Sequence, residues 1–111
     1  KIFKLMQSLD FSRSDRLSDQ VRNEIAIILR EEVKDPRLKG LTIIRVEISK
    51  DIKKAYIYFS SINSFNQTNL EDVLLGFEKA KGFIRSLLGK RMKVKRVPEI
   101  FLEEDKLEKL S

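Results

Sequence analysis

The spacing of the apolar residues changes along this chain, and these changes constrain its fold more than any other feature. Over 17–29 the spacing is that of one helix face, with apolar residues at Leu17, Val21, Ile25, Ile28 and Leu29. Pro36 requires the helix to stop near Lys34, because proline pushes the residue before it out of the α region. The sequence therefore predicts one amphipathic helix that ends at a structured turn.

The spacing then changes to that of β-strands. Two β-branched and aromatic segments, 41–49 and 55–62, flank a short polar turn, which predicts an antiparallel hairpin. In the first strand we expect one face to hold Thr42, Ile44, Val46 and Ile48. In the second strand Tyr56 and Tyr58 lie opposite the apolar face. They could stack on nucleic-acid bases, but we favour packing, with the first helix half-covering their face.

Helical spacing returns after residue 69 and is interrupted at Gly82. We expect two helices that meet at an angle at Ala80-Lys81-Gly82, followed by an extended segment that carries Lys93, Lys95 and, at an edge or bulge, Pro98. The predicted order is α-β-β-α-α-β, an α+β two-layer sandwich with helices on one face of three strands. We expect one domain over 1–111, with flexible ends at 1–11 and 106–111.

The composition argues against catalysis. The 111 residues include no cysteine and no histidine, which removes thiolate metal sites, thiol chemistry and the commonest general base. The spacing of Asp35, Glu47 and Asp51 does not make three metal ligands converge, so a carboxylate–metal nuclease is a weak alternative. No apolar run approaches the length of a membrane span. We therefore expect a soluble cytoplasmic protein, monomeric, without cofactor or metal and without enzymatic activity.

The positive charge is concentrated in one segment. Residues 81–98 contain seven Lys or Arg and no Asp or Glu, while 1–34 and 35–80 are each nearly neutral and 99–111 is acidic. A field of one sign attracts polyanions, and counterion release makes nucleic acid the first candidate. The alternative is a basic domain whose charges only maintain solubility.

Gly82 suggests how a phosphate could be held. A glycine at a helix joint lets a ligand backbone approach, and a helix that starts there offers free N–H groups. Lys81 and Arg85 would share the adjoining helix face, and an alanine at Gly82 would cost stability if φ were positive. Equally, Gly82 could only change the helix direction for packing.

These features resemble the ribosome-binding factor A family over about 12–105. The resemblance rests on five motifs in order: Ser12-Arg13-Ser14-Asp15-Arg16, Lys34-Asp35-Pro36-Arg37-Leu38, the hairpin pair Val46–Asp51 and Ala55–Tyr58, Ala80-Lys81-Gly82-Phe83-Ile84-Arg85, and Arg96-Val97-Pro98-Glu99-Ile100-Phe101.

The resemblance implies a type II KH-like fold with Ala-x-Gly in place of the usual Gly-x-x-Gly loop. It also implies a factor in ribosome biogenesis and rRNA processing that binds rRNA of the immature small ribosomal subunit, assists its late maturation, and is linked to growth in the cold. Without the Gly-x-x-Gly loop, recognition of RNA shape and backbone is expected rather than base-specific binding. A generic KH-like RNA- or DNA-binding regulatory module is the main alternative.

The candidate RNA-binding residues are the basic segment, its glycine and three arginines outside it. They are Arg13, Arg16, Arg37, Lys81, Gly82, Arg85, Lys90, Arg91, Lys93, Lys95 and Arg96. Arg37 is expected chiefly to stop the first helix through local hydrogen bonds, and it could contact RNA as well.

Overall fold

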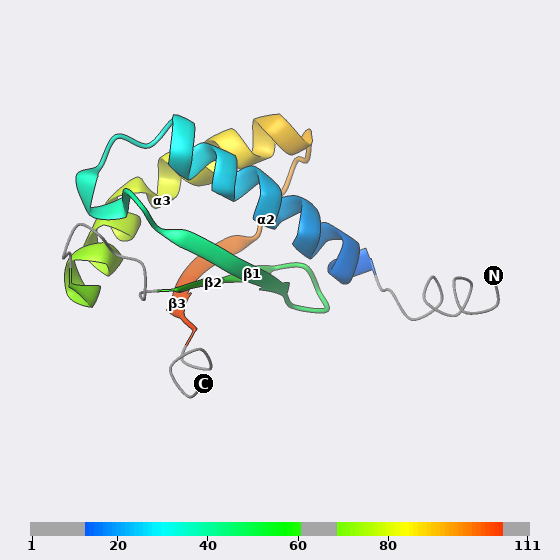
Figure 1. The fold of residues 1–111 in the computed structure, drawn as a ribbon. Coiled ribbons are helices and arrows are strands. Elements are labelled where there is room, and N and C mark those ends of the chain that lie inside the picture. The colour runs from blue at the N-terminus through cyan, green and yellow to red at the C-terminus, as the bar shows by residue number, and fades with distance from the viewer. Residues whose placement is uncertain (1–12, 61–68, 106–111) are drawn as a thin grey trace, which may run out of the picture.

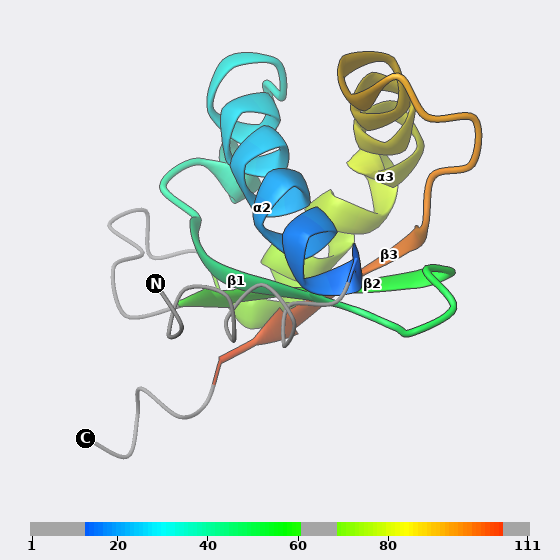
Figure 2. The ribbon, with the colours of Figure 1, turned by 90° about the vertical axis from the view of Figure 1, so that its right-hand side faces the viewer.

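Two α-helices cover one face of a three-stranded sheet in this computed structural model, which describes residues 13–60 and 69–105 (Figures 1 and 2). The elements are α2 (Arg13–Glu31), the 3₁₀ helix η1 (Pro36–Leu38), β1 (Thr42–Ile48), β2 (Lys54–Ser60), α3 (Leu70–Met92) and β3 (Glu99–Glu104). The α+β class with two layers is confirmed. The expected flexible ends lie outside the described residues, and the division into one KH-like domain stays a prediction.

The first helix forms where its apolar spacing predicts. Val21, Ile25 and Ile28 are fully buried on the face of α2 that meets the sheet. The helix ends at Glu31, slightly before Lys34, and the backbone N–H of Val33 donates to the carbonyl of Ile28 as the chain leaves it. This turn buries Val33 as well. The early end therefore extends the core beyond the helix.

The hairpin is antiparallel as predicted, but the inward face of β1 differs from the expected one. A β-bulge lies between Ile43 and Arg45, where the register moves from Ile43 opposite Phe59 to Arg45 opposite Tyr58. One extra residue reverses the alternation. Ile43 therefore packs against the core together with Val46 and Ile48, whereas Thr42 is exposed.

β3 lies beside β2 in parallel register, so β2 is the central strand of the sheet order β1-β2-β3. The strand starts at Glu99, after Pro98, as an edge strand requires. Lys93 and Lys95 do not belong to it, contrary to the expectation of one extended segment that carries both lysines and Pro98. Lys93 is the left-handed C-cap of α3, with φ 56°, and Lys95 lies in the loop that follows.

α3 is one helix, whereas two were expected. It runs without interruption through Ala80-Lys81-Gly82, and Figure 2 shows its axis changing direction along its length. The order of the described elements is accordingly α-β-β-α-β with the short η1 after α2. A continuous helix results because one glycine weakens helical propensity by only about 1 kcal/mol. Buried residues on either side of the glycine, such as Phe77, Ile84 and Leu88, outweigh that cost.

The core lies between the helices and the inner face of the sheet. Its largest fully buried side chains include Phe59 of β2, Phe77 of α3 and Ile25 of α2. Neither described helix is long and apolar enough to cross a bilayer.

Candidate nucleic-acid interface

Two cations of the basic segment, residues 81–98, contact β3 or the loop before it and so hold α3 against them. Arg85 donates hydrogen bonds from Nη2 to the carbonyl oxygen of Val97 at 2.7 Å and from Nε to that of Pro98 at 3.1 Å. Lys81 pairs with Glu78 at 3.3 Å, and its Nζ lies 5.1 Å from the ring centroid of Phe101. Lys81 and Arg85 share a helix face as predicted, but both are engaged within the protein. Their contact with RNA stays a prediction.

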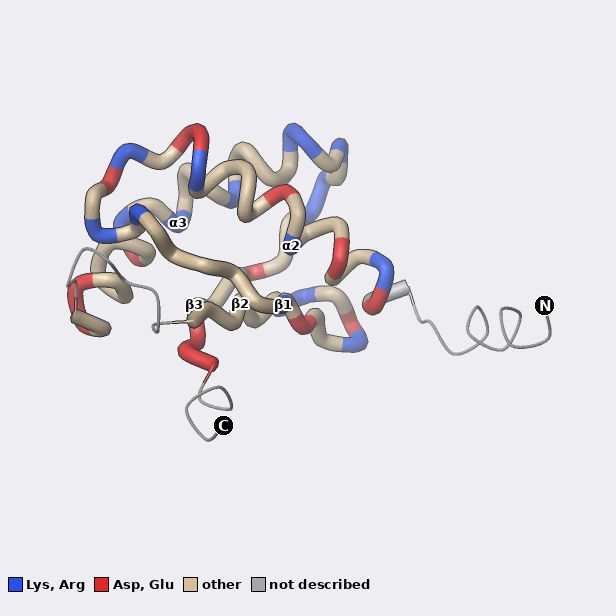
Figure 3. The backbone as a smooth tube through the Cα atoms, in the orientation of Figure 1, with Lys and Arg blue, Asp and Glu red and all other residues tan. Residues whose placement is uncertain are grey.

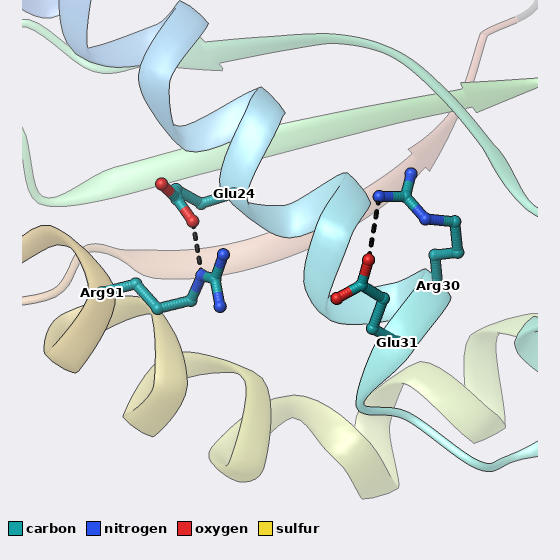
Figure 4. Close-up of polar contacts among 4 residues, drawn as sticks. All are labelled: Glu24, Arg30, Glu31 and Arg91. Carbon is teal, nitrogen blue, oxygen red and sulfur yellow. Dashed lines mark hydrogen bonds and ion pairs between the residues drawn. The ribbon is translucent and has the colours of Figure 1, made fainter.

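A third cation joins the two helices. Arg91, near the end of α3, donates from Nε to Oε1 of Glu24 in α2, as Figure 4 shows beside the exposed Arg30–Glu31 pair. The Glu24 carboxylate favours the charged guanidinium and raises the pKa of Arg91. No pattern in the sequence indicates this pair, because the two residues lie on different helices.

The other four cations of the segment gather at one end of the molecule. They are Lys90, Lys93, Lys95 and Arg96, which are all exposed and form no ion pair with any carboxylate among residues 13–60 and 69–105. We call these four residues the basic patch. Figure 3 shows basic positions at the end of α3 and in the next loop, whereas the end of β3 is acidic and points elsewhere. The charge asymmetry seen in the sequence is thus also an asymmetry in space.

The start of α2 borders the basic patch. Leu17 and Val21 line an apolar cavity of about 230 Å³ together with Val94, Arg96 and other residues of α3 and its loop. Arg16 precedes Leu17 and is exposed, and its contact with RNA stays a prediction. Arg13 begins α2, and the position of its side chain lies outside what the structure describes.

Arg37 lies at the opposite end of α3. Its guanidinium forms a two-point contact with the carboxylate of Asp35, at 3.0 Å from Nε and 2.7 Å from Nη2. The Asp35 carboxylate also accepts from the backbone N–H of Arg37 at 2.9 Å, which caps η1. These hydrogen bonds lower the pKa of Asp35 to about 2. The pair therefore caps η1 and shapes the turn that follows α2. The local hydrogen bonds expected of Arg37 are present, and its contact with RNA stays a prediction.

Gly76, which no sequence pattern indicated, leaves room for the Asp35–Arg37 pair to pack against α3. It is buried in α3, and a Cβ there would lie 3.3 Å from side-chain atoms of both Arg37 and Asp35. The glycine lets η1 approach the helix closely. Met92 lies sixteen positions after Gly76 in α3, or roughly 24 Å along the helix axis at 1.5 Å per residue. The structure therefore separates Arg37 from the basic patch.

The phosphate cradle expected at Gly82 does not form as predicted. Because α3 is continuous there, the backbone N–H groups around Gly82 bond within the helix instead of being free at a helix start. Gly82 is nevertheless exposed, its φ is not positive, and a Cβ would meet nothing within 4 Å. It leaves an open surface on α3 without supplying hydrogen-bond donors.

The outer face of the sheet carries aromatic rings that each contact a neighbouring side chain. The rings of Tyr56 and Phe101 stack with centroids 5.4 Å apart, and the Arg45 guanidinium lies 4.0 Å from the centroid of Tyr58. Arg45 also pairs with the buried Asp105 at 2.8 Å. These contacts favour packing over base stacking, as expected. The cover comes from neighbouring strands, however, because α2 lies on the other face.

The three carboxylates considered for a metal are held apart by separate partners. Asp35 contacts Arg37, Glu47 contacts Arg45, and Asp51 accepts from the Ser49 hydroxyl. Within the described part of the chain, no three carboxylates are grouped so as to hold a metal ion. The arrangement offers cations for an anionic surface rather than ligands for a cation.

Comparison with known proteins gives one consistent family. The family profile described as ribosome-binding factor A matches residues 13–110. The ribosome-binding factor A of Aromatoleum aromaticum is 41% identical over 96 residues, which cover 86% of this chain and 74% of that protein.

Two structural comparisons agree in fold. The crystal structure of ribosome-binding factor A from Thermus thermophilus has a TM-score of 0.71 at 22% identity, covering 84% of this chain and 97% of that one. A homology model of the Thermus thermophilus factor, fitted into a cryo-EM map of its complex with the 30S subunit, has a TM-score of 0.67 at 23% identity. That similarity covers 82% of this chain and 93% of the other.

Proposed function

Because the chain belongs to the ribosome-binding factor A family, we propose that it binds rRNA on the immature small ribosomal subunit and assists late maturation of that subunit without catalysing a reaction. The fitted Thermus thermophilus protein is a small-subunit ligand, which supports the choice of partner. The observation that carries the proposal is the basic patch, Lys90, Lys93, Lys95 and Arg96. Its cations are exposed and have no carboxylate partner among the described residues.

The physical mechanism is recognition of the RNA backbone. Four cations at one end of the molecule can contact neighbouring phosphates, and each contact releases condensed counterions. Phosphate contacts position a protein on RNA but carry no sequence information, so shape would decide where it binds. If four to six phosphates are neutralised, the slope of log affinity against log salt concentration should be about −3 to −5.

The test is co-sedimentation of the protein with ribosomal particles from cell extract. We expect enrichment on free small subunits and their precursors over translating ribosomes. Equal amounts on both would contradict the assembly role. Binding to many unrelated RNAs with the same affinity as to small subunits would instead support a generic RNA-binding module.

Charge-reversal variants test whether the basic patch is the contact surface. We expect Lys93→Glu with Lys95→Glu to weaken binding to purified small subunits strongly. The control pair is Lys34→Glu with Lys79→Glu, which makes the same charge change far from the patch. Both lysines are exposed; Lys34 precedes Asp35 in the chain, and the charge of Lys79 helps to lower the pKa of Asp35. Equal losses from both pairs would show that only net charge matters.

A further inference from the structure

A groove joins two segments that the sequence keeps apart. It has a volume of about 610 Å³ and lies between the turn that connects β1 to β2 and the loop that follows α3. Lys53 comes from the turn, and Lys95 and Arg96 come from the loop. Figure 2 shows the turn and the loop on the same side of the molecule. Charge in the hairpin turn, which is distant in sequence from the basic segment, therefore adds to the basic patch.

Hydrogen bonds fix both walls of this groove. In the turn, the Ser49 hydroxyl accepts from the backbone N–H groups of Lys53 at 3.2 Å and Lys54 at 3.0 Å. In the loop, Arg85 holds the carbonyls of Val97 and Pro98. The backbone N–H of Glu99 donates to the carbonyl of Lys53 at 2.9 Å, which ties the two walls together. A ligand would thus meet cations whose backbone is already in position, which lowers the entropic cost of binding.

The charge balance of the groove favours an anion. Its four cations are Lys53, Arg85, Lys95 and Arg96, and its two carboxylates are Asp51 and Glu99. Asp51 is satisfied within the turn, since it accepts from the Ser49 hydroxyl at 2.6 Å and from the backbone N–H of Lys53 at 3.2 Å. Arg85 uses two of its five N–H groups on backbone carbonyls and keeps its charge.

We infer that this groove holds a phosphate of the RNA backbone between Lys53 on one wall and Lys95 and Arg96 on the other. The inference rests on the proposed function and adds the hairpin turn to its contact surface. A groove suits a sugar–phosphate strand because it places cations on both sides of one phosphate, whereas a flat patch contacts it from one side. No covalent step is involved.

The test compares two lysines of the same turn. Lys53 lines the groove and Lys50 does not, yet both are exposed and both lose one charge on substitution by glutamine. For Lys53→Gln we expect a loss of affinity for purified small subunits of about three- to tenfold, the size expected when one ordinary hydrogen bond is lost at an exposed site. The salt slope should become shallower by about 1. Lys50→Gln should leave both quantities near the wild-type values, and thermal melting should show both variants folded.

A double-substitution cycle tests whether the two walls share one ligand. If Lys53 and Lys95 contact the same phosphate, Lys53→Gln with Lys95→Gln should lose less than the product of the two single losses. Independent, multiplicative losses would overturn the shared site. Protein-free small-subunit rRNA serves as a second probe. If the variants lose the same affinity for that RNA, the result supports a phosphate ligand. If they lose affinity only for intact subunits, the phosphate inference is overturned in favour of an acidic protein segment as the ligand.

The outcomes also separate this inference from the proposed function. If the wild-type protein binds small subunits and Lys53→Gln binds equally well, the groove inference fails and the proposed function stands. If Lys53→Gln and Lys50→Gln lose affinity equally, the effect is net charge and the inference fails too. If the wild-type protein shows no preference for small subunits, the proposed function itself fails.

Discussion

Arg85 of α3 donates a 2.7 Å hydrogen bond from Nη2 to the backbone carbonyl of Val97, and this bond holds the loop that carries half of the basic patch. Nε of the same guanidinium donates to the next carbonyl, that of Pro98. A residue expected from the sequence to contact RNA therefore has a demonstrable role inside the protein. It connects the packing of α3 to the position of the cations beyond it.

The first prediction follows from this contact. Arg85→Ala should lower the free energy of unfolding by about 1.5–3 kcal/mol, because it removes charge-assisted bonds to two carbonyls. Thermal and urea unfolding measure the loss. Lys90→Ala, an exposed position five residues further along α3, should change stability by no more than about 0.5 kcal/mol. Equal stability of the two variants would show that the guanidinium contributes nothing to holding the loop.

The second prediction concerns Gly82. Its backbone is helical and a Cβ there meets open space, so Gly82→Ala should raise stability by about 0.5–1 kcal/mol through helix propensity. This reverses the loss expected from sequence for a glycine of positive φ. Melting of the variant gives the sign. If the stabilised variant binds small subunits less well, then RNA approaches α3 at this point; unchanged binding would make the glycine neutral for function.

The third prediction concerns Gly89, where space is lacking. A Cβ there would lie 2.9 Å from Cγ2 of Val97, whose backbone is held by Arg85. Gly89→Ala should therefore destabilise the protein, by about 1–3 kcal/mol as for other overpacked sites. Val97→Ala introduced into that variant should recover part of the loss, because it removes the clashing methyl group. A Gly89→Ala protein that melts at or above the wild-type temperature would contradict the close contact.

The fourth prediction separates stability from binding at Lys93. This residue caps α3 in the left-handed conformation, with φ 56°, which costs a non-glycine residue about 1 kcal/mol or more. Lys93→Gly should raise the melting temperature and at the same time weaken binding to small subunits, since it removes a cation of the basic patch. Lys93→Asn, which also tolerates this conformation, provides the matched control for charge loss. Stronger binding by the glycine variant would count against the patch.

The fifth prediction is a pH dependence at Asp35. The hydrogen bonds from Arg37 lower the pKa of this carboxyl from its ordinary value of 3.8 to about 2. Because the folded pKa is the lower one, the stabilisation is present above about pH 4 and is lost as the pH falls towards 2. Asp35→Asn should thus melt below the wild type at neutral pH, with a difference that shrinks between about pH 4 and pH 2. A difference that is independent of pH would show that the ion pair is not its cause.

Local patterns predicted the parts of the fold that local physics controls. The spacing of Val21, Ile25 and Ile28 predicted α2, because side chains at helical intervals share one face whatever they pack against. The short polar turn predicted the antiparallel hairpin, because parallel strands would need a much longer connection. The bulge between Ile43 and Arg45 escaped prediction, since either register keeps β-branched residues in the strand and only the core selects between them.

The concentration of positive charge in 81–98 follows from the sequence alone, because charge depends only on residue type. The packing of helices and strands then selects which of those charges can meet a ligand. Arg91 pairs with Glu24, 67 residues away, and Arg85 turns inward to backbone carbonyls, whereas Lys53 joins the groove from outside the segment. Such contacts form between elements that are distant in the chain, and neighbouring residues carry no information about them.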